Sequence, residues 1–319
     1  MQVAQRPETA GALWFMAGGS EFSKFKEKPD AVLMLNSACN AKCRYCYIPY
    51  NGKRTPQDAL EATRILMQQG FRVLFSGSEN LLDLRYLECY KEAEQDYILS
   101  NGIIPARQPE VLRRLKASGI SEVTLSYNFG EPGRSIPDYV VRQAMRNSLR
   151  AGLSVRLSTL ITSRNYLRLP EYCAEARLLG ASRIRFYRYM EVGNANLGES
   201  LMIDAGQEAR FFELMERTRP RYPREELEIK LAVGFSPRPG SRSERLAREN
   251  RFCPAGETLF AITPDNNVYG CPFTIGEGLE IGRLTPDGLE IYRDISNGMR
   301  STCLALEGIN INSGKHPNQ

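Results

Sequence analysis

The chain has 319 residues but a single histidine, His316, and it has no run of 18 apolar residues. Without such a run, the sequence predicts no helix that crosses a membrane. The first 25 residues also lack the charged and then apolar pattern of a secretory signal. Eight cysteines without such a signal indicate a reduced, cytoplasmic compartment in which thiols bind metal. The formal net charge of +5 is modest for this length; it permits an anionic substrate and does not indicate a nucleic-acid partner.

Three of the cysteines lie within eight residues, at Cys39, Cys43 and Cys46, just after the apolar run 31–35. Three thiolates this close can bind three irons of a [4Fe–4S] cluster and leave the fourth iron without a protein ligand. A zinc site is the alternative. Zinc sites usually close with a fourth Cys or His at short range, and the nearest remaining candidate is Cys89. The spacing therefore favours a cluster with one open coordination site.

Short apolar runs alternate with longer amphipathic stretches up to about residue 190. The runs that predict strands are residues 31–35, 72–75, 97–99, 122–127, 154–161 and 183–190. The stretches between them predict helices, with Thr55-Pro56 as a start signal and Gly119, Gly152 and Gly180 as stop signals. Six such repeats predict an α/β fold, a partial (β/α)6 TIM-like barrel with catalytic groups where strands end.

The Cys-x3-Cys-x2-Cys spacing, with the aromatic Tyr45 before the third cysteine, resembles the signature of the radical S-adenosylmethionine (SAM) superfamily. The resemblance to a radical SAM barrel covers about half of the chain. It implies that SAM chelates the open iron, and that an electron from the cluster cleaves SAM to methionine and a 5′-deoxyadenosyl radical. That radical abstracts hydrogen from a substrate. An electron donor such as flavodoxin or ferredoxin is then an expected partner.

The same resemblance implies residues that hold SAM. The turn Gly77-Ser78-Glu79 after the second strand is similar to the Gly-Gly-Glu-like turn of the family, in which backbone and Glu bind the SAM amino group. Ser126 resembles a SAM-contacting serine, with Asn128 where an acidic residue is often found.

Polar residues alternate with apolar ones in the last three predicted strands, so the polar set should face the barrel lumen. The fifth strand places Arg156 and Ser158 where contacts to the SAM carboxylate and ribose are expected, although Arg142 and Arg146 on the preceding helix compete for the carboxylate. The expected substrate-binding residues follow in the sixth strand: Arg183, Arg185 and Tyr187. Buried arginines are costly without an anion; the alternative is that they pair with loop carboxylates or lie at exposed strand ends.

A second group of cysteines lies near the C-terminus, at Cys253, Cys271 and Cys303. Alternating stretches around residues 264–267 predict a β-hairpin that brings the first two together. The segment resembles the twitch and truncated SPASM modules that carry auxiliary iron–sulfur clusters, which makes the three cysteines candidate ligands of a second cluster. Alternatively, Cys253 or Cys271 is a free hydrogen-atom donor, or the thiols are buried packing groups. Cys89 and Cys173 are expected to be packing groups.

The predicted organisation is an N-terminal extension (1–30), the partial barrel (31–235), a linker (236–252) and the auxiliary-cluster module (253–319), a small α+β unit with a hairpin and a helix at 287–299. Because only about 30 residues precede the first strand, we expect a small polar substrate rather than a ribosomal peptide. A sugar, an aminocyclitol or a nucleotide-like molecule would suit the polar lumen. Epimerisation or oxidation is the expected outcome, with decarboxylation or dehydration also open. The alternatives are a peptide- or tRNA-modifying radical SAM enzyme and a non-catalytic iron–sulfur or zinc protein.

Overall fold

The computed structural model describes residues 28–48, 52–128, 135–193, 195, 201–232, 235, 255–256, 258–275 and 278–292. Cys253 and Cys303 lie outside the described residues. The strands of the described part form two sheets, with the orders β11-β10-β9-β8-β1-β2 and β3-β4-β5-β6-β7. Their bounds are β1 Asp30–Met34, β2 Arg72–Ser76, β3 Tyr97–Ser100, β4 Glu122–Ser126, β5 Ser154–Ile161, β6 Arg183–Arg188, β7 Glu228–Leu231, β8 Leu259–Ile262, β9 Asn267–Tyr269, β10 Glu280–Thr285 and β11 Gly288–Ile291.

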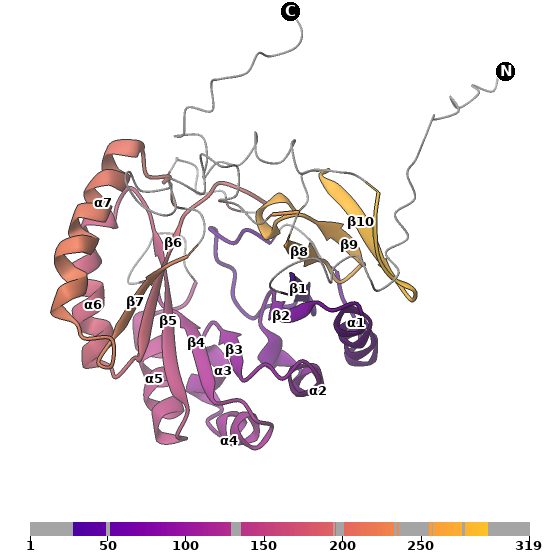
Figure 1. The fold of residues 1–319 in the computed structure, drawn as a ribbon. Helices are drawn as coiled ribbons and strands as arrows, with labels where there is room; N and C mark the ends of the chain where they lie inside the picture. Colours follow the sequence, from indigo (N-terminus) through magenta and orange to yellow (C-terminus); the bar gives the residue numbers. More distant parts are fainter. Residues whose placement is uncertain are drawn as a thin grey trace, which may run out of the picture.

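The parallel strands form the wall of an open barrel, with the helices outside it (Figure 1). The strands β1 and β2 pair in parallel, as do neighbouring strands from β3 to β7. The two sheets are separate between β2 and β3. The fold is therefore the predicted α/β partial barrel, and it includes the strand β7 beyond the six repeats.

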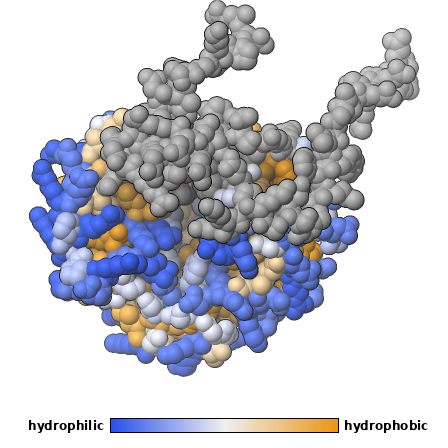
Figure 2. Space-filling view, viewed as in Figure 1, coloured by the Kyte–Doolittle hydropathy of each residue, from blue (hydrophilic) through white to orange (hydrophobic). Residues whose placement is uncertain are grey.

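The helices of the described part are α1 Pro56–Gln68, α2 Leu87–Glu92, α3 Ile103–Arg107, α4 Glu110–Ala117, α5 Asp138–Arg150, α6 Leu169–Leu178 and α7 Ala205–Thr218. Four of them begin or end near the predicted signals: α1 begins at Pro56, and α4, α5 and α6 end two residues before Gly119, Gly152 and Gly180. Thr55 caps α1 by accepting the Asp58 N–H, and Asp204 and Gln207 form a capping box at α7. None of these helices has the length and apolar character that a membrane span requires. In Figure 2, hydrophilic residues gather along the rim where the helices lie.

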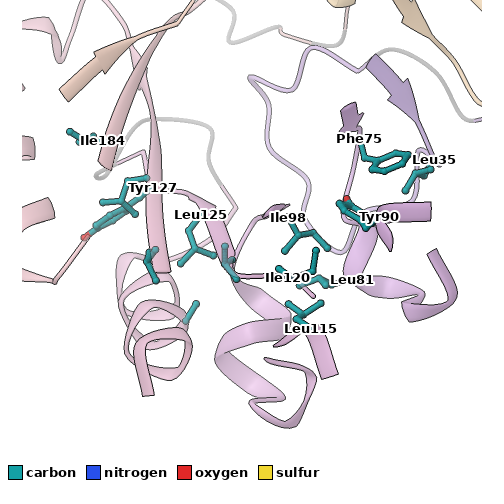
Figure 3. Packing of buried hydrophobic residues seen from close by; sticks show 14 of the residues in the cluster. Leu35, Phe75, Leu81, Tyr90, Ile98, Leu115, Ile120, Leu125, Tyr127 and Ile184 are labelled. Carbon is teal, nitrogen blue, oxygen red and sulfur yellow. The ribbon is translucent and has the colours of Figure 1, made fainter. Parts of the chain in front are cut away.

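The core lies between the outer face of the strands and the helices (Figure 3). The strand β5 shows why: Val155, Leu157 and Ile161 are fully buried, whereas Arg156 and Ser158, at the alternate positions, stay partly exposed. Because side chains of a strand alternate between its faces, the apolar set faces the helices and the polar set faces the lumen. The sequence pattern of this strand is thus confirmed.

The predicted C-terminal hairpin is present as β8 and β9, and it joins the barrel instead of standing apart. The strand β8 pairs in parallel with β1, with Ala31 opposite Phe260, and β9 pairs antiparallel with β8. Arg54, which is buried, also connects the two regions, because its guanidinium donates to the Thr263 carbonyl at 2.9 Å and to Asn266 Oδ1 at 2.5 Å.

The helix predicted over 287–299 is wrong for the residues that the structure describes. Residues 288–291 form the strand β11, which pairs antiparallel with β10. The strand begins at Gly288, which follows a tight turn. Gly288 has a φ of +130°, a backbone conformation that a residue with a side chain rarely adopts. Beyond it, the buried Leu289 and the half-buried Ile291 alternate with the exposed Glu290, which is the period of a strand.

Candidate functional site

The three-cysteine loop follows β1 directly, at the carboxyl end of the parallel strands. Cys39 is exposed, and Cys43 and Cys46 are half-buried. The Cys46 N–H donates to the Cys43 carbonyl at 3.2 Å, which folds this part of the loop into a turn. The Ala41 N–H donates to Cys39 Sγ at 3.4 Å, and the Ser135 hydroxyl lies 3.4 Å from Cys43 Sγ. Hydrogen bonds to sulfur are among the features that tune an iron–sulfur cluster.

Partial burial raises the pKa of the Cys39 and Cys46 thiols, and the neighbouring Cys43 raises both further. A bound cation reverses this effect, because a coordinated thiol loses its proton. Within the described ranges, no three His, Cys, Asp or Glu side chains are placed to hold a single metal ion. Three thiols on one loop, with donors to sulfur, fit a cluster.

The turn after β2 packs against this loop. The Glu79 N–H donates to the Ala38 carbonyl at 3.0 Å. Gly77 has a φ of +107°, and a Cβ there would lie 3.0 Å from the Asn36 carbonyl oxygen. Only glycine suits both the backbone conformation and this close approach. Ser78, which lies between Gly77 and Glu79 in the turn, is half-buried.

Glu79 is fully buried in this turn. Its Oε2 accepts the Asn101 N–H at 2.7 Å, and its Oε1 has no hydrogen-bond partner within the described residues. Burial raises the pKa of Glu79 to about 7. An unpaired oxygen of a buried carboxyl group fits the predicted acceptor for an ammonium group, because a cation at this place would satisfy the oxygen and favour the charged form.

Two asparagines that were not assigned to the site from the sequence connect its loops by hydrogen bonds. Asn101 donates from its backbone to Glu79, and its Nδ2 lies 3.6 Å from Cys39 Sγ and 2.8 Å from Asn40 Oδ1. Asn128 donates to the Tyr45 hydroxyl at 2.8 Å and accepts the Leu160 N–H at 2.9 Å.

The place of Asn101 in a turn directly after a strand was the available signal for it. For Asn128, the signal was its position two residues after Ser126, which itself is exposed at the end of β4.

The predicted lumenal residues come together around one cavity of about 420 Å³. Its lining includes Arg156 and Ser158, expected at SAM, and the expected substrate residues Arg183, Arg185 and Tyr187. Arg142, the competing candidate on a helix, lies elsewhere: its Nη2 is 2.6 Å from Glu175 Oε1, between α5 and α6.

Cys271 is half-buried just after β9. Tyr47, which follows Cys46, packs against Phe273 with ring centroids 5.3 Å apart. Burial raises the pKa of Tyr47, and Cys46 and Cys271 both act on it in the same direction. Tyr47 therefore lies near both cysteine regions. The full ligand set of a second cluster stays a prediction, because its other two cysteines lie outside the described residues. Cys89 and Cys173 are fully buried, as packing groups are.

No family model matches the sequence. Mycofactocin maturase MftC of Mycobacterium tuberculosis is 28% identical over 275 residues, which cover 80% of this chain and 67% of MftC. Among solved structures, Streptococcus suis SuiB bound to the precursor peptide SuiA has a TM-score of 0.65 at 16% identity, over 86% of this chain and 67% of SuiB. The structure of anSMEcpe with bound SAM and the peptide Cp18Cys has a TM-score of 0.56 at 13% identity, over 80% of this chain and 77% of that one.

The open barrel and the cysteine loop after its first strand are the arrangement expected of a radical SAM enzyme. The similarity to MftC, and to the fold of SuiB and anSMEcpe, confirms the predicted resemblance to radical SAM enzymes with a twitch- or SPASM-type C-terminal module.

The expected small polar substrate, with its sugar-like chemistry, is wrong. SuiB is solved with a precursor peptide and anSMEcpe with a peptide, so the relatives favour the alternative of a peptide substrate. The expectation rested on the short segment before the first strand, which says nothing about what the lumen binds. Arginine, tyrosine and serine side chains recognise the carboxylates and amides of a peptide as well as the hydroxyls of a sugar.

Proposed function

We propose that the protein is a peptide-modifying radical SAM enzyme that abstracts a hydrogen atom from one residue of a peptide substrate. The observation that carries this proposal is the match to SuiB with its precursor peptide, which extends over 86% of the chain. MftC, a maturase by name, supports it from the sequence. As MftC and SuiB extend beyond the matched two thirds of their lengths, their own substrates are not transferred to this chain.

Cys39, Cys43 and Cys46 would hold a [4Fe–4S] cluster, and the neighbours solved with SAM support SAM as its partner. When bound at these cysteines, the cluster would supply the electron for reductive cleavage of SAM. Glu79 Oε1 would accept a hydrogen bond from the ammonium group of SAM. Gly77, which has no side chain, would let the backbone of the turn approach SAM closely. Ser126 and Ser158 face the lumen as candidate contacts to the rest of the cofactor.

The substrate would bind in the lumen of the barrel. The cavity is lined by Arg183, Arg185 and Tyr187 on β6, which are donors for a peptide. Cys271 then has two alternative roles, a ligand of an auxiliary cluster or a hydrogen-atom donor. A ligand would serve oxidation of the peptide, because the electron left after hydrogen abstraction needs an acceptor. A donor would serve epimerisation, because hydrogen returns to the opposite face.

The proposal is tested with the full chain, reconstituted anaerobically with iron and sulfide and reduced with dithionite in the presence of SAM. Incubation with a randomised peptide library should produce 5′-deoxyadenosine together with peptides of altered mass or altered stereochemistry. Cys43→Ala supplies the matched control, in which neither product should form. Cleavage of SAM without modification of any library peptide would contradict the proposal.

A further inference from the structure

Four arginines line the cavity in the lumen: Arg72 from β2, Arg156 from β5, and Arg183 and Arg185 from β6. Arg72 and Arg183 are the first residues of their strands, and Arg156 is the third of its own. The cavity thus lies toward the amino-terminal ends of the strands, whereas the cysteine loop follows the carboxyl end of β1. Its location separates it from the cysteine loop and from Glu79, while Ser158, a candidate contact of SAM, lies at its edge.

The strand register explains why these side chains gather on one face. Across the sheet, Thr124 of β4 is opposite Arg156, which is opposite Arg183. In the next row, Ser158 of β5 is opposite Arg185, which is opposite Lys230 of β7. Since residues two apart on a strand share a face, the two rows present their side chains together to the lumen.

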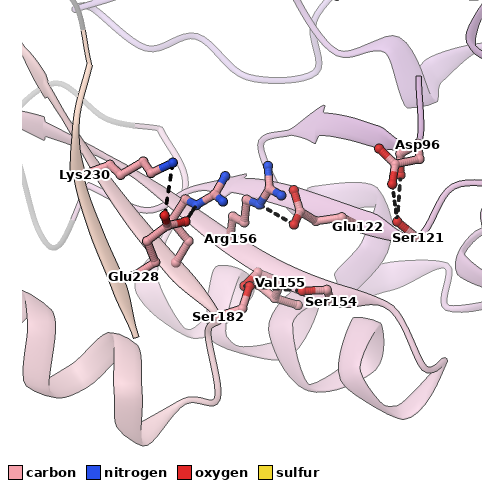
Figure 4. Close-up of polar contacts among 10 residues, drawn as sticks. Asp96, Ser121, Glu122, Ser154, Val155, Arg156, Ser182, Glu228 and Lys230 are labelled. Atoms are coloured by element: carbon pink, nitrogen blue, oxygen red, sulfur yellow. Dashed lines mark hydrogen bonds and ion pairs between the residues drawn. The ribbon is translucent and has the colours of Figure 1, made fainter. Parts of the chain in front are cut away.

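Three of the four arginines already have a carboxylate. Arg72 pairs with Asp30 at 2.6 Å, and the other two are paired across the sheet, Arg156 with Glu122 and Arg183 with Glu228. Glu228 also forms an ion pair with Lys230, whose Nζ lies 3.0 Å from Glu228 Oε1 (Figure 4).

Arg185 differs from these three. Although it lines the same cavity and is partly buried, it has no ion pair or hydrogen bond with any residue that the structure describes. Acidic side chains are present in the lining at Glu94 and Asp96, which are exposed, and Asp96 accepts the Ser121 hydroxyl at 2.7 Å.

Arg185 lines this cavity beside three other arginines, and like charges at this range repel one another. The mutual effect is visible at Arg156, whose pKa is lowered by burial and further by Arg183 and Arg185. A ligand with one negative charge would relieve this repulsion. Carboxylate matches the planar fork of a guanidinium through two parallel hydrogen bonds, and the hydroxyl of Tyr187 adds a donor in the same cavity.

We propose that this cavity binds a carboxylate of the peptide substrate, with Arg185 as the residue that recognises it. The inference rests on the proposed function, and it names the substrate class as a peptide with an acidic side chain or a free C-terminus at this place. Tyr187 lines the cavity and also acts electrostatically on Tyr47, next to Cys46. Tyr187 thus belongs to the cavity and lies within electrostatic range of the tyrosine beside Cys46, and the carboxylate would anchor the peptide away from the reacting carbon.

The test measures binding, by calorimetry under anaerobic conditions, to the full reconstituted chain with SAM. The probes are N-acetyl-Gly-Glu-Gly-amide, its Gln counterpart, and N-acetyl-triglycine with a free C-terminus. The variants are Arg185→Gln, Arg185→Lys and the control Arg113→Gln, which changes an exposed arginine on the outer helix α4. Circular dichroism verifies that each variant is folded, and Arg185→Lys retains the charge if the glutamine variant fails to fold.

We expect a carboxylate probe to bind at least about tenfold more tightly than the Gln probe, which corresponds to about 1.4 kcal/mol. That preference should disappear in Arg185→Gln, be reduced in Arg185→Lys because the fork is lost, and persist in Arg113→Gln. Preference for the Glu probe assigns the site to a side chain, and preference for N-acetyl-triglycine assigns it to a C-terminus.

The inference is overturned if wild type binds the Glu and Gln probes alike and shows no preference for N-acetyl-triglycine, if no probe binds, or if Arg185→Gln behaves as Arg113→Gln does. Production of 5′-deoxyadenosine and of modified library peptides by the wild type, measured separately, tests the proposed function. A wild type that modifies peptides without the carboxylate preference refutes this inference alone. A wild type that prefers carboxylates but modifies no peptide refutes the proposed function.

Discussion

Replacing Glu79 by Gln should have opposite effects on the free protein and on SAM binding. Glu79 is fully buried, one of its oxygens has no partner among the described residues, and its pKa is raised from 4.5 to about 7. Since the folded state holds the proton more tightly than the unfolded state, the neutral acid contributes stability at low pH. That contribution is lost as the pH rises from about 4.5 through about 7.

The magnitude follows from the pKa values. A difference of about 2.5 units corresponds to about 3 kcal/mol at pH 8. The amide of Glu79→Gln cannot ionise, and its oxygen can still accept the Asn101 N–H. Without SAM, the variant should therefore be more stable than wild type at pH 8 by up to about 3 kcal/mol, and this advantage should vanish near pH 4.5. Binding of SAM should weaken about tenfold or more, because the ammonium loses a charged acceptor.

The assay is urea unfolding of the cluster-loaded, SAM-free protein at several pH values, together with equilibrium binding of SAM, both under anaerobic conditions. Glu88→Gln on α2 is a control, because Glu88 is an exposed carboxylate. The reasoning is refuted if Glu79→Gln is less stable than wild type at pH 8, or if it binds SAM as tightly as wild type does.

Three further variants test the cysteine site and its support. Cys43→Ala should abolish SAM cleavage and lower the iron content, whereas Cys173→Ala, in the core, should retain both; SAM cleavage by the first variant would contradict the cluster assignment. Cys271→Ala should still cleave SAM but form no product, and unchanged product would exclude both of its proposed roles. Asn128→Ala should cost about 1 kcal/mol of stability, because the part-buried Leu160 N–H loses its acceptor. It should also slow SAM cleavage, because Tyr45 loses its hydrogen bond with Asn128; normal kinetics would show that Tyr45 needs no such support.

The fold was predictable where the sequence carries a local period. The alternation of Val155, Arg156 and Leu157 indicated both the strand β5 and its polar face, and Thr55-Pro56 indicated the start of α1. The pairing of β8 with β1 was not predictable, because it joins segments more than 200 residues apart through backbone hydrogen bonds that leave no sequence signal. Residues 288–291 were misassigned to a helix because the turn at Gly288 was overlooked.

The site was predictable to the extent that its residues belong to a motif. The three cysteines follow from their spacing, whereas Glu79 was indicated by the resemblance of its turn to that of radical SAM enzymes. The support from Asn101 and Asn128 could not be predicted, since each depends on a contact between distant loops. The arginine partners were equally hidden: spacing does not tell that Arg156 has a carboxylate and that Arg185 has none within the described residues.

The most direct test of the central claim is the transfer of deuterium from a peptide into 5′-deoxyadenosine. Peptides that the library experiment shows to be modified are synthesised with deuterium at each residue in turn, and the nucleoside is analysed by mass spectrometry. The account predicts deuterium in 5′-deoxyadenosine from one labelled residue of the peptide. Formation of 5′-deoxyadenosine without deuterium from any residue would contradict it.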